Sequence, residues 1–129
     1  MEKEKTILVD VWNCFLTEDG VNKDMHEMLE EFPNKKILLT NADDDDKKRF
    51  NMFNMPYELF TMEHNPDKVD PVYYEKMFEH FGLKAEDVVY FEHNSDAVKS
   101  AESLGIDTLH YDKGKKDLQE IKSFLVENL

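Results

Sequence analysis

The chain has 129 residues, of which 40% are hydrophobic and 12% aromatic, a composition typical of one folded globular domain over residues 1–129. Its 29 acidic residues outnumber its 16 lysines and arginines, and the formal charge of −13 repels both nucleic-acid phosphates and anionic lipid, so DNA, RNA and membrane surfaces are not expected as partners. A single cysteine, Cys14, excludes an internal disulfide, and without a long apolar segment or N-terminal signal pattern a cytoplasmic protein is expected.

Short apolar runs alternate with amphipathic segments along the chain, a rhythm typical of repeated strand–helix–strand units. The apolar runs predict five strands, at 7–11, 36–40, 57–61, 88–92 and 108–111. Helical spacing and helix-start signals predict five helices, beginning near Met25, the Asp43–Asp46 run, Tyr73, Ala97 and Leu118. Because most of the strands are apolar on both faces, we predict an α/β fold with a parallel sheet covered by helices on each side.

Polar residues stand at the carboxyl ends of these strands, where parallel sheets bind ligands. They are Asp10 after the first strand, Thr40 and Asn41 after the second and Glu92 after the fourth, while Lys68 lies in the loop before the long central helix. Each alone also fits a structural role as a loop acid, a helix cap or a solvated side chain. A carboxylate at the mouth of an apolar strand, however, is costly unless it is paired, hydrogen-bonded or metal-bound. Together these residues predict a ligand site.

These residues, in this order, resemble the motifs of the haloacid dehalogenase-like (HAD) superfamily over nearly the whole chain. ILVDVWNCFLT looks like the family's first motif, an apolar strand followed by Asp-x-Asp-Gly-Thr-Leu, and ILLTNA looks like its second. The segment 68–111 is similar in spacing to the family's lysine loop, helix, Gly-Leu turn, strand and acidic fourth motif. The resemblance implies a Rossmann-like three-layer α/β/α sandwich with strand order 5-4-1-2-3. The segments between the motifs are too short to house a cap domain.

The resemblance also implies a role for each matched residue. Asp10 would attack a phosphoryl group and become an aspartyl phosphate, Thr40 would hold phosphoryl oxygens, and Lys68 would offset the charge between them. Asn41 and Trp12 would contact the substrate. A Mg²⁺ ion is the implied cofactor, with ligands from Asp10, the Trp12 backbone carbonyl, Glu92 and, at a spacing used by some members, Asp96.

The departures from the family pattern concern proton transfer. Phosphatases of the family place an aspartate two residues after the nucleophile, where it protonates the leaving oxygen and activates water, but this chain has Trp12 there. An indole cannot exchange a proton at neutral pH, and such general acid–base help is typically worth ~10²–10⁴-fold in rate. In the fourth motif, His93 replaces one of the paired acids.

Two functions therefore stay open. The first is a HAD-like hydrolase or phosphotransferase with impaired acid–base catalysis, acting on a phosphorylated small molecule or macromolecule. The second is a catalytically silent HAD-like domain that binds a protein partner or a phosphate-bearing ligand. Asp10, Thr40 and Lys68 favour the first function, whereas Trp12 and His93 favour the second.

Other polar and apolar groups are interpreted as structural. The Asp43–Asp46 run suits the first turn of a helix, where acids are favoured by the helix dipole. Cys14 is interpreted as a packed free thiol, since no catalytic triad pattern accompanies it. The segment 49–60, RFNMFNMPYELF, is interpreted as core packing, and most of the five histidines as surface residues.

Overall fold

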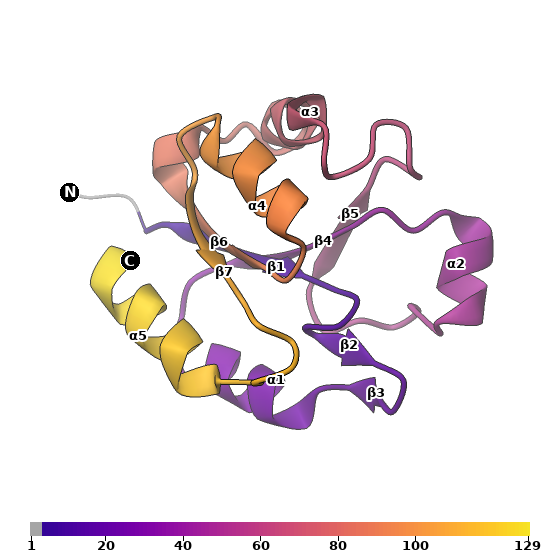
Figure 1. The fold of residues 1–129 in the computed structure, drawn as a ribbon, viewed down its shortest axis with the longest axis horizontal. Coiled ribbons are helices and arrows are strands. Elements are labelled where there is room, and N and C mark those ends of the chain that lie inside the picture. Colours follow the sequence, from indigo (N-terminus) through magenta and orange to yellow (C-terminus); the bar gives the residue numbers. More distant parts are fainter. Residues whose placement is uncertain (1–3) are drawn as a thin grey trace.

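A five-stranded parallel sheet lies at the centre of residues 4–129, which are the residues described by the computed structural model (Figure 1). Its strands are β1 (Thr6–Asp10), β4 (Lys36–Thr40), β5 (Glu58–Thr61), β6 (Val88–Glu92) and β7 (Asp107–His110). They are ordered β5-β4-β1-β6-β7, and each neighbouring pair is parallel. If only these five strands are numbered along the chain and the sheet is read from β7 to β5, this is the predicted order 5-4-1-2-3. The α/β fold and its sheet topology are therefore confirmed.

Two of the five strands have the predicted bounds, and the other three differ from the prediction by one residue. The first strand ends at Asp10 because the chain turns at Val11, whose carbonyl accepts hydrogen bonds from the backbone amides of Cys14 and Leu16 at 3.2 and 2.8 Å. The first and last strands are therefore shifted by one residue toward the N-terminus, and the third begins at Glu58 rather than Tyr57.

Helices cover both faces of the sheet. They are α1 (Lys23–Glu30), α2 (Asp44–Arg49), α3 (Pro71–Phe81), α4 (Ser95–Glu102) and α5 (Leu118–Asn128), with one 3₁₀ turn, η1 (Ala85–Asp87). Figure 1 shows α1 and α5 on one face and α3 and α4 on the other. None of the helices in residues 4–129 is long and apolar enough to cross a membrane.

Strand side chains alternate between the two helical layers, as the pleat of a strand requires. In β1, Ile7 and Val9 pack in the cluster that includes helices α1 and α5, whereas Leu8 packs with Tyr73 and Met77 of α3. All five residues of β1 are buried, since the strand is central and covered on both faces. The site at the end of β1 is therefore held by a central strand that is buried along its whole length.

Helix starts follow the side-chain capping rule. Asp43 caps α2, where its side chain accepts from the Asp46 amide while the Asp46 side chain accepts from the Asp43 amide. The acidic run 43–46 thus starts a helix, as predicted. At the other end of a helix, Gly82 closes α3 with a φ of +66°, the left-handed conformation that glycine adopts most easily.

A short hairpin after β1 was not predicted. It pairs β2 (Leu16–Thr17) with β3 (Gly20–Val21), and Gly20 turns the chain with a φ of +100°. Two-residue strands carry too little alternation to be read from sequence. Within residues 4–129, only this hairpin and α1 lie between β1 and β4, and only α2 and β5 lie between β4 and α3, so no cap domain is inserted there.

Candidate active site

The carboxyl ends of three neighbouring strands carry the predicted site residues. Asp10 ends β1, Thr40 ends β4 and Glu92 ends β6, while Lys68 reaches the same edge from the loop before α3. Their side chains are buried, with 1% of Asp10, 6% of Lys68 and 0% of Glu92 exposed. The parallel pairing of β1 with β4 and with β6 therefore brings together residues that are up to 82 positions apart.

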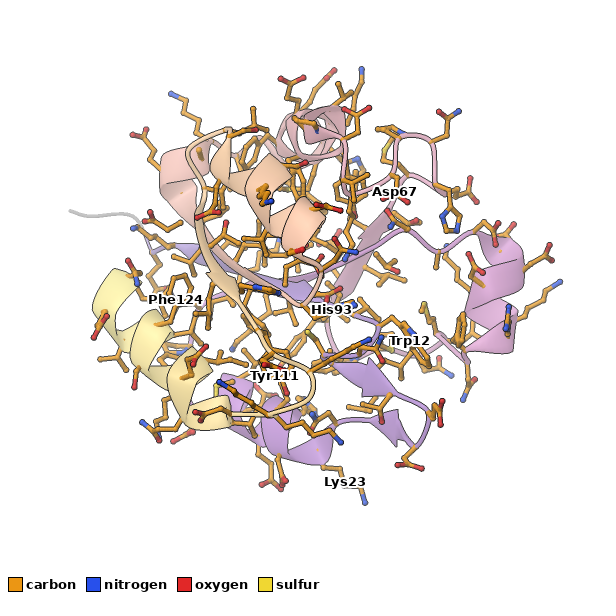
Figure 2. All side chains as sticks on the ribbon, in the orientation of Figure 1. Trp12, Lys23, Asp67, His93, Tyr111 and Phe124 are labelled. Atoms are coloured by element: carbon orange, nitrogen blue, oxygen red, sulfur yellow. The ribbon has the colours of Figure 1, made fainter. Side chains whose placement is uncertain are left out.

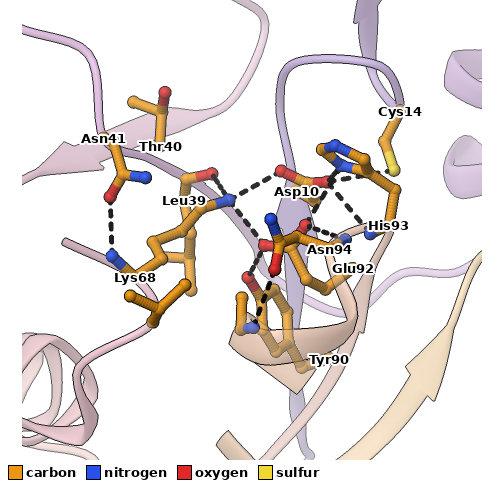
Figure 3. A network of polar contacts seen from close by, with 12 residues as sticks. Asp10, Cys14, Leu39, Thr40, Asn41, Lys68, Tyr90, Glu92, His93 and Asn94 are labelled. Carbon is orange, nitrogen blue, oxygen red and sulfur yellow. Dashed lines mark hydrogen bonds and ion pairs between the residues drawn. The ribbon is translucent and has the colours of Figure 1, made fainter. Parts of the chain in front are cut away.

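Lys68 bridges the two buried carboxylates (Figure 3). Its Nζ lies 2.6 Å from Asp10 Oδ1 and 2.6 Å from Glu92 Oε1, and it also donates to the carbonyl of Leu39 at 3.3 Å. Burial by itself lowers the pKa of Lys68, but the two carboxylates outweigh this and hold the pKa well above its ordinary value. The loop is fixed as well, because the Lys68 amide donates to Asn41 Oδ1 at 2.7 Å.

His93 bridges the same two carboxylates through their other oxygens. Its Nδ1 contacts Asp10 Oδ2 and lies 3.2 Å from Glu92 Oε2, and its backbone amide donates to Asp10 Oδ2 at 3.2 Å. Hydrogen bonding to Asp10 and Glu92 raises the pKa of His93 to about 9, so the ring is a cation at neutral pH. Sequence reasoning treated His93 as a missing acid and overlooked its contacts. Its place directly after a carboxylate that ends a strand is the sequence signal that could have indicated a contact with the cluster.

The cluster is balanced in charge, with two carboxylates against one ammonium and one imidazolium. Burial raises the pKa of Asp10, an effect that Lys68 opposes. Burial would also raise the pKa of Glu92, but Lys68 and the hydrogen bonds of the cluster hold it well below its ordinary value. Glu92 gains two further donors, the Tyr90 hydroxyl at 2.6 Å on Oε1 and the Asn94 amide at 3.1 Å on Oε2.

Cys14 completes the surroundings of Asp10. Its side chain is 1% exposed, and its thiol donates to Asp10 Oδ2 at 3.3 Å. Burial, together with the nearby carboxylates, raises the pKa of the thiol well above its ordinary value, so Cys14 is a neutral thiol at neutral pH. The prediction of a packed free thiol is confirmed. The ligand atoms of Asp10, Cys14 and His93 nevertheless all lie within 4.8 Å of one another, close enough to hold one metal ion.

A cavity of about 230 Å³ opens onto this cluster. Asp10, Lys68, Glu92 and His93 line it together with the predicted site residues Trp12, Thr40 and Asn41. Figure 2 shows Trp12 and His93 beyond the carboxyl ends of the strands, on the side of the sheet where α2 lies. The Trp12 indole packs against Phe50 with ring centroids 4.3 Å apart and ring planes tilted by 40°, so one wall of the cavity is aromatic.

Other polar residues lie in the wall of the cavity or outside it. Asp46 and His64 line it and bond each other at 2.6 Å, a contact that raises the pKa of His64. Asp96 is exposed in the first turn of α4 and does not line the cavity, so the structure leaves this expected metal ligand outside the cluster.

The 49–60 segment, predicted to pack in the core, does so only in part. Met52 is buried, whereas Phe53 is 52% exposed.

Comparison with known proteins finds similarity in fold but not in sequence. Neither a family model nor a curated protein sequence matches the chain. Among solved structures, an aspartate-to-alanine mutant of a HAD family enzyme from Bacteroides thetaiotaomicron, in complex with magnesium and inorganic phosphate, has a TM-score of 0.74 at 13% identity and covers 92% of this chain and 99% of its own.

Two further solved structures have the same fold. A HAD-superfamily hydrolase of subfamily IA from Geobacter sulfurreducens has a TM-score of 0.65 at 12% identity, covering 84% of this chain and 90% of its own. The cobalt-bound deoxy-D-mannose-octulosonate 8-phosphate phosphatase from Haemophilus influenzae has a TM-score of 0.50 at 14% identity, covering 97% and 88%. The neighbours are thus HAD hydrolases and phosphatases, and they confirm at the level of fold the resemblance seen in the motifs.

Proposed function

We propose that this chain is a HAD-like phosphoryl-transfer domain in which Asp10 forms an aspartyl phosphate and acid–base catalysis is impaired. The observation that carries the proposal is the pairing of Asp10 with Lys68, both buried at the inner end of a cavity that Thr40 also lines. A carboxylate becomes a phosphoryl acceptor when a fixed cation offsets the charge of the incoming group. The inorganic phosphate in the complex of one structural neighbour and the phosphate ester in the enzyme name of another support this choice of substrate class.

The first chemical step would transfer the phosphoryl group to Asp10. A carboxylate oxygen forms a bond to phosphorus while the bond from phosphorus to the leaving oxygen breaks, and the electron pair departs with that oxygen. Lys68 would neutralise charge on the transferred group, and the Thr40 hydroxyl would donate to one of its oxygens. The indole N–H of Trp12 is not acidic enough to protonate a leaving oxygen at neutral pH, so the leaving group must be stable as an anion.

The second step would release phosphate by attack of water on the aspartyl phosphate. Attack requires a base that takes a proton from the water, and the indole of Trp12 cannot act as one. Because general acid–base help contributes about 10²–10⁴-fold, the aspartyl phosphate should persist for a long time compared with one that has a carboxylate at this position. The substrate is proposed to be a phosphorylated small molecule or macromolecule.

The Mg²⁺ ion expected from the family resemblance does not fit this arrangement of side chains. Its ligands would be the outer oxygens Asp10 Oδ2 and Glu92 Oε2, and the His93 ring nitrogen lies against both. Mg²⁺ requires oxygen ligands near octahedral geometry, and nitrogen and sulfur are poor substitutes. Mg²⁺ binding at this cluster therefore requires the His93 ring to move away, and no step above depends on the ion.

A silent binding domain is the second candidate function. It is favoured because every carboxylate oxygen of Asp10 and Glu92 is already paired with a cationic side chain. Lys68 holds one oxygen of each carboxylate, and His93 lies against the other oxygen of each. A carboxylate with every oxygen engaged is a weaker nucleophile than a free one. In this case the aromatic-walled cavity would hold a phosphate-bearing ligand, or the surrounding face a protein partner, without turnover.

Phosphorylation by an activated phosphate separates the two candidates. Acetyl phosphate has a leaving group that needs no protonation, so wild type should gain one phosphoryl group, detected by mass spectrometry, and Asp10→Asn should gain none. Trp12→Asp should shorten the lifetime of the adduct and raise turnover of alkyl phosphates. Asp67→Asn is a matched control, because Asp67 lines the same cavity and makes no contact with Asp10. An unmodified wild type together with an inactive, folded Trp12→Asp protein would leave the silent domain as the function.

A further inference from the structure

Three side chains of different chemistry converge on one side of Asp10. The ligand atoms Asp10 Oδ2, Cys14 Sγ and His93 Nδ1 all lie within 4.8 Å of one another. These are an oxygen, a sulfur and a nitrogen donor, and a fourth atom, Glu92 Oε2, lies 3.2 Å from the His93 nitrogen. Sulfur and imidazole donors select zinc and related transition metals over magnesium.

Backbone structure holds each donor in place. Cys14 is turned back toward the strand end because its own amide donates to the Val11 carbonyl and the next amide, of Phe15, donates to the Asp10 carbonyl, both at 3.2 Å. His93 follows β6 directly, and its amide is bonded to Asp10 Oδ2. Cys14 and His93 therefore lie in turns directly after strand ends, and backbone hydrogen bonds fix both turns against the end of β1, as a metal site requires.

The separations of these atoms suit a four-coordinate ion. Bonds of about 2.0–2.1 Å to nitrogen or oxygen and about 2.3 Å to sulfur place neighbouring ligands of a tetrahedral ion roughly 3.3–3.6 Å apart. Cys14 Sγ is 3.3 Å from Asp10 Oδ2, and His93 Nδ1 is 3.2 Å from Glu92 Oε2. The His93 nitrogen and Asp10 Oδ2 are in direct contact, and the ion would part these two atoms.

We propose that Asp10, Cys14 and His93, with Glu92 as a further oxygen donor, form a binding site for Zn²⁺ or Co²⁺. The site goes beyond the proposed phosphoryl transfer, since it uses a thiol that has no role in that chemistry and is tested without any substrate. The second group of candidate ligands, Asp43, Asp46 and His64, carries no such proposal. Its acids already cap α2, and His64 is exposed.

Cobalt absorption tests the site directly, because the chain has a single cysteine. Metal-free wild-type protein titrated with CoCl₂ should develop a thiolate-to-cobalt charge-transfer band in the near ultraviolet that saturates at one ion per chain. ZnCl₂ should abolish the band, and MgCl₂ should leave it unchanged. Cobalt binding without this band, or no binding at all, would overturn the proposal.

Variants assign the donors. Cys14→Ser should lose the band, and His93→Asn should weaken Co²⁺ affinity by roughly tenfold or more. His64→Asn, which removes the nitrogen donor of the second group, should behave as wild type. If Cys14→Ser proves unfolded by circular dichroism, X-ray absorption of zinc-loaded wild type decides the question. One sulfur at about 2.3 Å supports the site, and a shell of oxygen and nitrogen alone refutes it.

Discussion

Replacing Lys68 with methionine removes the cation between two buried carboxylates while keeping a side chain of similar length. In the wild type, the ammonium lies 2.6 Å from an oxygen of Asp10 and 2.6 Å from an oxygen of Glu92, and only 6% of the lysine is exposed. Removing one partner of a buried ion pair costs about 3–5 kcal/mol, because the other charge stays buried without compensation. His93 still faces the outer oxygens, so we expect the low end of this range.

A loss of about 3 kcal/mol is a large share of the roughly 5–15 kcal/mol that stabilises a domain. For 129 residues, each kcal/mol corresponds to about 3–5 °C, so the melting temperature of Lys68→Met should fall by about 10 °C. The loss should also depend on pH. Without Lys68, burial and mutual repulsion raise the folded-state pKa of the two carboxyl groups above the value of about 4 in the unfolded chain.

The sign of the pH dependence follows from this raised pKa. A carboxyl group with a raised folded pKa stabilises the fold fully below its unfolded pKa, and that stabilisation is lost as the pH rises through the folded pKa. Lys68→Met should therefore lie closer to wild type at about pH 5 than at about pH 7.5. Urea unfolding at both pH values, followed by the fluorescence of the single tryptophan, Trp12, gives the comparison.

Lys35→Met is the matched control for this experiment. Lys35 also pairs with a carboxylate, Glu58, but at 3.6 Å and with both side chains more than half exposed. Such a surface pair is worth about 0–1 kcal/mol. The interpretation of the cluster is refuted if Lys68→Met loses no more stability than Lys35→Met, or if its loss is the same at both pH values.

Three other outcomes follow from single contacts. The His93 ring should titrate near pH 9 by NMR in wild type and at a clearly lower pH in Asp10→Asn; an unchanged value would contradict its bonding to Asp10. Tyr90→Phe should lower the free energy of unfolding by about 1–3 kcal/mol, because the buried carboxylate of Glu92 loses a 2.6 Å donor, and a neutral substitution would show that the bond contributes nothing. Gly82→Ala should cost about 1 kcal/mol in urea unfolding through its φ of +66° alone, since no atom lies within 4 Å of the added Cβ; a stabilised variant would contradict this reasoning.

The sheet and the meeting of Asp10, Thr40 and Glu92 could be predicted because both follow from simple regularities. Continuous apolar runs mark strands covered on both faces, and the carboxyl ends of parallel strands share one edge. Lys68 lies outside any strand, and only its place in the family's motif order indicated that it would reach Asp10. The strands and the α/β class needed the pattern alone, whereas the strand order and the site also needed the resemblance.

The contacts of Cys14 and His93 with Asp10 were not predicted, because they depend on turns rather than on periodicity. The direction of the Cys14 side chain is set by a turn in which Asn13 has a φ of +66°, and asparagine gives only a weak signal for that conformation. His93 was compared with the acid that the family has at its position, and that comparison concealed its own ability to pair with carboxylates. Both misses concern what replaced the family residues, not where those residues lie.

The neutrality of the buried cluster limits which substitutions the sequence can accept during evolution. A single substitution that removes the charge of Asp10, Lys68, Glu92 or His93 leaves a buried imbalance, whereas a second, opposite change restores it. In diverging relatives of this chain, we expect these four positions to change in compensating pairs, such as loss of a carboxylate with loss of a cation. A chain with an acid in place of histidine at position 93 would need an additional cation to keep the buried cluster neutral.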